Sequence, residues 1–261
     1  MNSRSVGIVI PTLGDRPEYL AECLSSVRLA GPAVVAVVAT PAVQEALRIA
    51  GIDPDIWIDD PGGGAARAIN AGIAHLPEEI EAVGWIGDDD LLERNTLLDL
   101  EQEIGGHAAA VFGACRYIDN RGSELFVNRS SRLAPVLMRI GPNLLPQPGS
   151  LIARSAWVAV GGLDESLRWT FDLDLFIRLR KVGRLHRVDR ILASFRWHPG
   201  SLTAGARQGS VDEASKVRLQ HMPPPLRVVA RMWEPAVRRV ILIAGNRVTG
   251  KITRRNSAGG L

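Results

Sequence analysis

The chain has 261 residues, of which 46% are hydrophobic and 23% are charged, a composition typical of globular proteins rather than disordered or fibrous ones. Its two cysteines, Cys23 and Cys115, lie far apart and form no CxxC pair, which argues against a disulfide framework and a cysteine zinc site. The formal net charge is +3, but residues 223–261 carry +7 and the remainder −4, so the basic balance gives no reason to expect a nucleic-acid partner.

The N-terminal segment predicts no targeting signal. Residues 1–6 are short and polar and lead directly into an apolar strand pattern. No run approaches the roughly 20 apolar residues that a membrane-spanning helix needs. We therefore expect a cytoplasmic protein that is soluble or peripheral to a membrane.

The first hundred residues alternate between strand and helix patterns. Short β-branched runs are each followed by a segment with apolar residues at helical spacing. The predicted pairs are 6–10 with 16–29, 33–38 with 42–50, 56–58 with 65–76, and 82–86 with 95–104. Because crossovers between parallel strands are right-handed, this alternation predicts an α/β fold with a mostly parallel sheet and helices on both faces.

After Gly105 the alternation stops. Residues 108–117 and 124–128 read as two strands around a turn at 119–122, which predicts a hairpin. A proline-rich loop, a short strand at 150–153 and a helix at 154–160 ended by two glycines follow. Further on, 173–182 is helical, and 185–188 and 192–197 are predicted to be extended.

Three consecutive carboxylates, Asp88, Asp89 and Asp90, follow the apolar strand pattern at 82–86. Adjacent like charges raise one another's pKa and need a compensating cation or proton. Hard cations such as Mg²⁺ and Mn²⁺ take oxygen ligands and keep positions open for phosphate oxygens, which suits a metal–diphosphate site. The alternative is a helix start, where Asp caps the first turn.

Polar residues follow three of the predicted strands. Pro11 and Thr12 follow the first strand, Asp59 and Asp60 the third, and the acidic triplet Asp88–Asp90 the fourth. In an open parallel sheet, ligands bind outside the carboxyl ends of the strands. These residues are therefore expected to gather at one edge of the sheet.

Six segments between Ser5 and Ser201 resemble family 2 glycosyltransferases of the GT-A type. The segments, in the order of that family, are Val9–Thr12 with Arg16–Leu20, Ala66–Gly72, Gly87–Leu91, Gly161–Glu165, Phe171–Arg178 and Phe195–Ser201. The resemblance implies a GT-A, Rossmann-like fold and transfer of a sugar from a nucleotide-diphosphate donor to an acceptor hydroxyl, with inversion at the anomeric carbon. Such a displacement needs a cation for the leaving diphosphate and a base for the acceptor proton.

The resemblance implies a role for several acidic residues and one histidine. It makes Asp172 the general base, with Asp174 as the competing position. It makes the metal ligand Asp89, with Asp88 near the ribose, or Asp90 if the motif begins at Asp88. His198 matches a histidine that some relatives place on their metal, and a structural histidine is the alternative. Mg²⁺ or Mn²⁺ is the expected cofactor.

The donor is expected to contact Pro11, Thr12, Asp88 and Arg67. Arg67 is a candidate for the diphosphate, with a solvated helix face as the alternative. The segment at 34–39 is followed by Thr40-Pro41, where relatives present an Asp to uracil, so the identity of the donor's nucleobase is left open. Asp59 or Asp60 is a candidate reader of the base, although a turn before the glycines at 62–64 explains both equally well.

Residues 223–261 form a separate basic segment after the glycosyltransferase-like part, residues 1–222. Arginines and an apolar stripe (Val229, Trp233, Ala236, Val237, Val240, Ile243, Ala244) predict an amphipathic helix, with Pro235 as a kink or boundary. Such a helix suits an anionic membrane surface at the inner face of the membrane and a lipid-linked acceptor. The alternative is that the stripe packs on the domain or on a second subunit.

Two other functions compete with sugar transfer to a glycan, lipid-linked or small-molecule hydroxyl. A nucleotidyltransferase has a similar sheet and acidic metal site, but it normally carries a lysine in the loop after the first strand, and Pro11–Asp15 has none. A catalytically silent sugar-nucleotide-binding protein is favoured by Phe171, which stands where the family has Glu.

Overall fold

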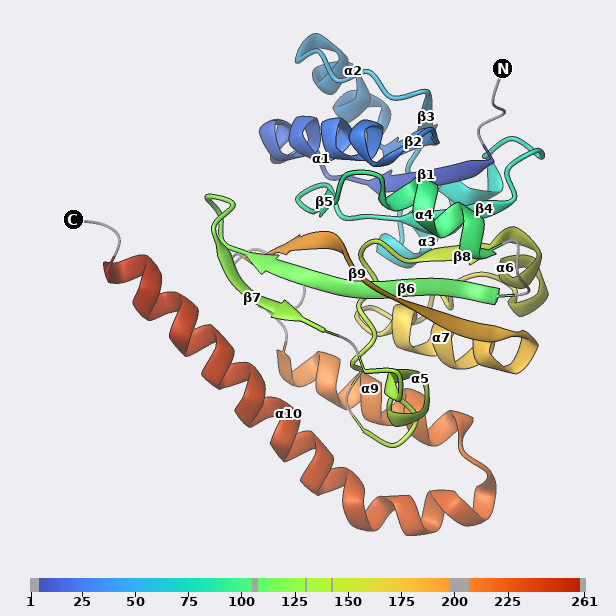
Figure 1. The fold of residues 1–261 in the computed structure, drawn as a ribbon, viewed down its shortest axis with the longest axis vertical. Coiled ribbons are helices and arrows are strands. Elements are labelled where there is room, and N and C mark those ends of the chain that lie inside the picture. The colour runs from blue at the N-terminus through green and yellow to red at the C-terminus, as the bar shows by residue number, and fades with distance from the viewer. Residues whose placement is uncertain (1–4, 105–107, 130, 142, 198–206, 259–261) are drawn as a thin grey trace.

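The computed structural model describes residues 5–104, 108–129, 131–141, 143–197 and 207–258. They form a twisted α/β sheet with helices on both faces, as predicted (Figure 1). The strands are β1 (Val6–Pro11), β2 (Val34–Ala39), β3 (Ile56–Asp59), β4 (Ala82–Trp85), β5 (Leu91–Leu92), β6 (Ala108–Ile118), β7 (Glu124–Asn128), β8 (Leu151–Ala153) and β9 (Arg184–Arg196). The helices are α1 (Pro17–Ala30), α2 (Pro41–Ile49), α3 (Ala65–Ala74), α4 (Thr96–Ile104), α5 (Ala134–Leu137), α6 (Arg154–Val160), α7 (Phe171–Val182), α9 (Arg207–His221) and α10 (Pro224–Ala258).

The strand order is β3-β2-β1-β4-β8-β6-β9-β5, with β7 paired to β6. β3, β2, β1 and β4 are parallel neighbours, as the alternation predicted. β8 runs antiparallel between β4 and β6, and β9 returns parallel to β6. The sheet is therefore mixed, and the predicted parallel arrangement holds in its N-terminal half.

Two hydrophobic cores cover the two faces of the sheet. Val6, Ile8 and Ile10 of β1 point into the core with α1 and α4, while Val9 points into the core with α3, α6 and α7. Full burial of each such side chain contributes about 1.5–3 kcal/mol, so alternate strand residues hold helices on both faces.

Three parts of the predicted element order differ in the structure. The segments expected at 185–188 and 192–197 are one strand, β9, whose register against β6 shifts beside Val188–Arg190. Asp189 and Arg190 are exposed there, which hid the continuity of the strand. The short elements β5 and α5 and the whole of α9 were not predicted, and α10 continues through Pro235.

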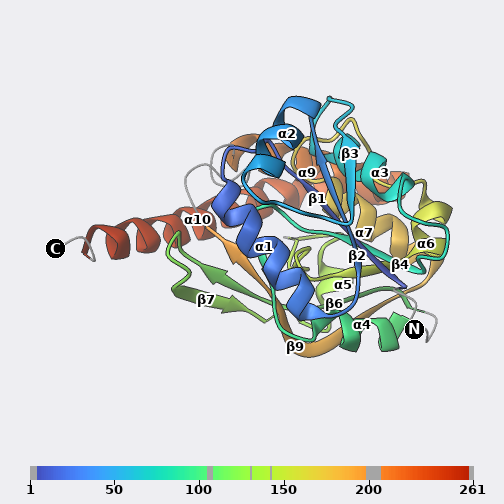
Figure 2. The same cartoon turned by 90° about the horizontal axis from the view of Figure 1, so that it is seen from above.

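The C-terminal helices add a further layer beyond α7. α9 packs on α7, α10 packs on α9, and the end of α10 extends past the body of the molecule (Figures 1 and 2). A buried ion pair joins the two helices, because Arg218 Nε and Nη2 lie 2.7 and 2.9 Å from the Glu234 carboxylate. No helix in the described part of the chain combines the length and apolarity needed to cross a bilayer.

Candidate active site

The carboxyl ends of β1 and β4 meet through Thr12 and Asp88. The Thr12 hydroxyl donates to Asp88 Oδ2 at 2.5 Å and accepts the Gly14 amide at 3.0 Å. Its own amide donates to the Val38 carbonyl of β2 at 3.0 Å. Pro11 is the last residue of β1 beside it. The predicted convergence at this edge of the sheet is therefore present for Pro11, Thr12 and Asp88.

Asp89 and Asp90 turn toward different partners. Asp89 Oδ2 lies 3.1 Å from Arg16 Nη1, and the other amino group of Arg16 lies 3.6 Å from Asp88 Oδ1. Asp90 is 4% exposed, and its Oδ1 accepts the Arg196 amide of β9 at 2.8 Å. Arg16 supplies positive charge to two of the three carboxylates.

Burial shifts the pKa of two of the three carboxyl groups, Asp88 and Asp90. It raises the pKa of Asp88 above its ordinary value, against the hydrogen bond from Thr12, which lowers it. Burial also raises the pKa of Asp90 well above its ordinary range, and the neighbouring Asp89 charge adds to that shift. The negative charges are therefore costly here, as the sequence suggested, and added positive charge at this edge would stabilise them.

Asp172 lies at the start of α7, near the same edge of the sheet. The ring of Phe171, the preceding residue, lies 6.4 Å from the ring of Trp85, which ends β4. Loop residues span the gap: Gln147 Nε2 donates to the Trp85 carbonyl at 2.8 Å, and Asn143 Nδ2 donates to Asp172 Oδ2 at 3.1 Å. The acidic triplet and Asp172 therefore belong to one region, although 82 positions separate Asp90 from Asp172 in the sequence.

Tyr117 of β6 is influenced by the charges of both Asp90 and Asp172. Burial raises the pKa of Tyr117 above its ordinary value, and the negative charges of Asp90 and Asp172 raise it further. Both Asp90 and Asp172 thus act on the same phenol. Because the Tyr117 hydroxyl stays protonated at neutral pH, it adds no negative charge to the region.

Burial also sets the protonation of Asp172. It raises the pKa of Asp172 to about 6, although backbone amides at the helix start and Asn143 lower it. The sequence led us to expect that the helix start would favour the ionised form of this carboxylate. The backbone amides there do lower the pKa, but burial has the larger effect and brings the pKa to about 6.

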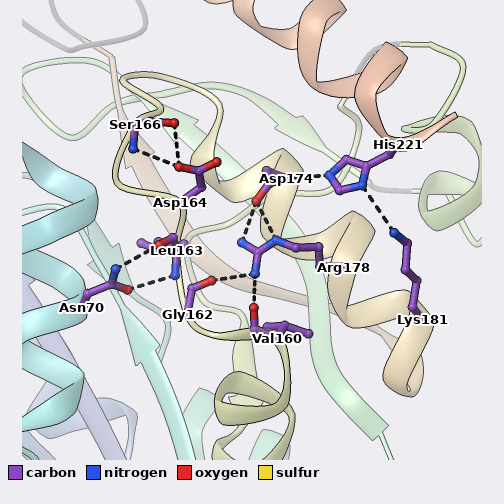
Figure 3. Close-up of polar contacts among 10 residues, drawn as sticks. All are labelled: Asn70, Val160, Gly162, Leu163, Asp164, Ser166, Asp174, Arg178, Lys181 and His221. Atoms are coloured by element: carbon purple, nitrogen blue, oxygen red, sulfur yellow. Dashed lines mark hydrogen bonds and ion pairs between the residues drawn. The ribbon is translucent and has the colours of Figure 1, made fainter.

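Asp174, the competing base, is held in a structural cluster (Figure 3). Burial raises its pKa, but His221 at 2.6 Å and Arg178 at 2.7 Å outweigh burial and lower it overall. Arg178 also donates to the carbonyls of Val160 and Gly162 at 2.6 and 2.7 Å. Asp174 therefore holds α7 against its neighbours.

Asp59 and Arg67 already have protein partners. Asp59 Oδ1 accepts a hydrogen bond from Gln44 Nε2 of α2 at 2.9 Å. Asp60 Oδ1 accepts the Gly62 amide at 2.9 Å, which fits the alternative of a simple turn. Arg67 is exposed on α3, and its Nε lies 3.7 Å from Glu165 Oε2.

The oxygen atoms beside Gly87 fit a hard cation. A methyl group at Gly87 would lie 2.9 Å from Asp89 Oδ1 and 3.2 Å from Asp90 Oδ2, so glycine leaves room between two carboxylate oxygens from adjacent residues. Within the described ranges, no three His, Cys, Asp or Glu side chains are arranged as a metal centre. His198, the predicted third ligand, lies outside the described residues.

Several residues of this region were not predicted. Arg16, Asn143, Gln147 and Tyr117 gather here from the residue before α1, the proline-rich loop and β6. Arg16 carries a local signal, since it is a cation just after the first strand. The others lie in segments without chemical motifs, and only the tertiary fold brings them to the site.

No protein-family model matches the chain. Curated relatives include an uncharacterized glycosyltransferase of Rickettsia conorii, 25% identical over 146 residues, which cover 52% of this chain and 24% of the relative. An uncharacterized glycosyltransferase of Rickettsia typhi is 26% identical over 152 residues, covering 54% of this chain and 46% of the relative. The chain thus spans less than half the length of these relatives.

Solved structures share the fold. S. aureus TarS 1–349 in complex with UDP-GlcNAc superposes with a TM-score of 0.63 at 13% identity, over 85% of this chain and 69% of that 1–349 chain. The mannosyltransferase PcManGT from Pyrobaculum calidifontis, in complex with GDP-Man and Mn²⁺, gives a TM-score of 0.58 at 16% identity, over 100% and 77%. The predicted fold class, a GT-A-like α/β sheet, is confirmed by this likeness.

Proposed function

We propose that this chain is a glycosyltransferase domain that moves a sugar, with inversion and with the aid of a divalent metal, from a nucleotide-diphosphate donor to an acceptor hydroxyl. The observation that carries the proposal is the gathering of Thr12, Asp88–Asp90 and Asp172 at one edge of the sheet. The names of the curated relatives and of the structures that share the fold support the same activity.

Asp172 is the proposed general base. A base must be ionised to accept the acceptor's proton, and it accepts that proton most readily when its pKa is not far below the working pH. A pKa of about 6 meets both conditions near neutrality. Asp174 does not, because His221 and Arg178 occupy its carboxylate.

The donor is proposed to bind over the ends of β1 and β4. Thr12 holds Asp88 in place, so the Asp88 carboxylate is oriented before any ligand arrives. Pro11 ends β1 beside it. For Arg67 and Asp59 to bind the donor as proposed, the donor would have to displace their present partners, Glu165 and Gln44. The structures that share the fold bind UDP-GlcNAc in one case and GDP-Man in the other, so both nucleotides belong in the test.

Mg²⁺ or Mn²⁺ would be held by Asp89 and Asp90 with His198. When bound, the cation would neutralise charge on the leaving diphosphate. The space beside Gly87 and the all-oxygen donors of the triplet fit such an ion. Mn²⁺ in the mannosyltransferase complex supports the choice of metal.

The first test is a panel of nucleotide sugars with Mn²⁺, scored by thermal shift and by slow donor hydrolysis. One donor should raise the melting temperature and be hydrolysed. Asp172→Asn should abolish transfer while donor binding by calorimetry is retained. Hydrolysis of no donor would favour a silent sugar-nucleotide-binding protein, and release of pyrophosphate from a nucleoside triphosphate would favour a nucleotidyltransferase.

α10 is proposed to bring the enzyme to an anionic membrane surface and thus to a lipid-linked acceptor. Val228, Met232 and Val240 are 69%, 82% and 61% exposed, so these apolar residues do not pack on the described body of the protein. Glu234, the one acid of residues 223–261, is buried against Arg218. The exposed surface of the helix therefore offers apolar and basic groups without acidic ones.

Vesicle sedimentation tests the membrane proposal with matched point variants. Wild-type protein should bind phosphatidylcholine vesicles that contain phosphatidylserine and should bind pure phosphatidylcholine much less. Met232→Glu should reduce binding, while Ile49→Glu, an equally exposed residue on α2 at 80%, should not. Equal binding by wild type and Met232→Glu would refute the proposal.

A further inference from the structure

The start of α7 is held by a carboxylate from another helix. Thr170, the residue before α7, makes no side-chain capping bond within its own helix. Instead Glu213 of α9 accepts the amides of Arg168, Trp169 and Thr170 at 3.0, 2.8 and 2.8 Å, and the Thr170 hydroxyl at 2.9 Å. Four donors converge on one carboxylate, two residues before Asp172.

α9 contacts the same turn at a second point. His221 Nε2 lies 2.6 Å from Asp174 Oδ1, on the first turn of α7 (Figure 3). Glu213 and His221 are eight residues apart, which is about 12 Å along a helix at 1.5 Å per residue. Asp172 therefore lies in the stretch of chain between two contacts with α9.

The other side of the turn is fixed by α3 and α6. Arg178 binds Asp174 and the carbonyls that end α6, and Asn70 of α3 exchanges hydrogen bonds with the Leu163 amide and carbonyl at 2.9 and 3.0 Å (Figure 3). Residues 168–170 lead into this turn, and the carboxylate that holds them is Glu213.

Glu213 also acts on Asp172 through its charge. Burial raises the pKa of Glu213, but the three amides and the Thr170 hydroxyl outweigh burial and lower it overall, so the side chain is ionised at neutral pH. Its negative charge is among the influences that raise the pKa of Asp172. Asn143, which donates to Asp172, is neutral, and Tyr117, whose pKa the Asp172 charge raises, is protonated.

We propose that Glu213 is a positioning residue for the reaction: from α9 it fixes the place of Asp172 through the amides of residues 168–170. This inference rests on the proposed function for its catalytic meaning. The hydrogen bonds of the Glu213 carboxylate go to residues 168–170, which lead into the turn that carries Asp172, so Glu213 acts on the site through Asp172. α9, which carries no sequence motif, becomes part of the active site in this way.

The test compares Glu213→Gln with Asp212→Asn in the full chain. Both replace an acid with its amide on the same helix, but Asp212 pairs with Arg238 of α10 and lies outside the site. We expect Glu213→Gln to lower kcat by about tenfold or more, since a displacement of a catalytic group by 1 Å costs up to about 100-fold. The KM for the donor should not change, and Asp212→Asn should match wild type.

Two further measurements do not depend on turnover. In Glu213→Gln the carboxyl carbon of Asp172 should titrate at lower pH than in wild type, and amides of residues 168–174 should exchange hydrogen faster. Thr170→Val removes one donor to Glu213 and keeps the Glu213 charge, so it should accelerate exchange to a smaller extent. This variant tests the inference if Glu213→Gln does not fold. Unchanged exchange and titration in the variants, relative to Asp212→Asn, would overturn the inference.

The outcomes separate the two proposals. If wild type transfers no sugar while the titration and exchange shift as expected, the proposed function fails and Glu213 is still shown to position Asp172. If wild type is active and Glu213→Gln equals it in kcat, titration and exchange, the proposed function stands and the role of Glu213 is wrong.

Discussion

Asp172→Asn should make the protein more stable at neutral pH, although it removes the proposed base. Burial raises the pKa of Asp172 to about 6, whereas a solvated Asp titrates near ~3.9. A difference of about two pH units corresponds to about 3 kcal/mol at roughly 1.36 kcal/mol per unit. Because the side chain is only half-buried, we expect about half of that, ~1.5 kcal/mol, at pH 7.5.

The sign follows from proton linkage. A carboxyl group with a raised pKa in the folded state binds its proton more tightly there than in the unfolded chain. Its favourable contribution is fully present below the unfolded value and is lost as the pH rises through about 6. Asparagine cannot ionise, so the gain from Asp172→Asn should be largest above pH 6 and should shrink toward pH 4.

Asp174→Asn is the matched control and should have the opposite effect. The same substitution two residues further along α7 removes a carboxylate whose pKa is lowered by His221 and Arg178. We expect a loss of about 1–3 kcal/mol at pH 7.5, typical for hydrogen bonds to charged groups. The assay is urea unfolding at pH 4.5 and pH 7.5. A destabilised Asp172→Asn at pH 7.5, or a gain independent of pH, would refute the assignment of Asp172 as a half-buried acid with a pKa of about 6.

Three other substitutions test separate parts of the structure. Glu234→Gln should accelerate hydrogen exchange in α9 by roughly two to four orders of magnitude, because breaking a buried ion pair costs about 3–5 kcal/mol. Asp212→Asn, which breaks a half-exposed pair between the same two helices, should cost less than about 1 kcal/mol. Equal acceleration of exchange by the two variants would contradict the prediction. Thr12→Val should weaken donor binding by about tenfold in calorimetry, since it removes the hydroxyl that orients Asp88. The control is Thr96→Val, which removes a buried hydroxyl bonded to the Leu192 carbonyl and should leave donor binding intact. Gly87→Ala should weaken Mn²⁺ binding by crowding Asp89 and Asp90, whereas Gly84→Ala, whose new methyl would lie 2.9 Å from the Ser150 carbonyl, should lower the melting temperature instead.

The sequence was sufficient to predict the sheet edge and its central residues. β-branched runs and helical spacing located β1 to β4 and their helices, because each element buries a regular apolar face. The position of Thr12 and Asp88 then follows, since parallel strands present their carboxyl ends at one edge. The meeting of Thr12 with Asp88 required no long-range information beyond strand order.

The directions of the side chains could not be predicted in this way. Asp88, Asp89 and Asp90 are adjacent in sequence, yet they face Thr12, Arg16 and the Arg196 amide. Each choice depends on strands or helices that are distant in the chain. The raised pKa of Asp172 could not be predicted for the same reason, because burial outweighs the local helix start.

α9 shows where pattern reasoning stops. Its residues include Asp212, Glu213, Arg218 and His221, so it has no clear apolar stripe by which to recognise it. Glu213 is instead paired with residues just before α7, His221 with α7, and Asp212 and Arg218 with α10. Burial through paired charges leaves no periodic hydrophobic signal, and only the structure places Glu213 beside the start of α7.

The ion pair between Arg218 and Glu234 constrains where the protein can be shortened. The prolines at 223–225 are the obvious place to truncate the chain, since the basic segment begins at that point. A protein shortened there would lack Glu234. The Arg218 guanidinium, whose side chain has 0% exposure, would then be buried without its counter-charge. A soluble fragment for crystallisation should therefore keep the first three turns of α10 and discard only what lies beyond them.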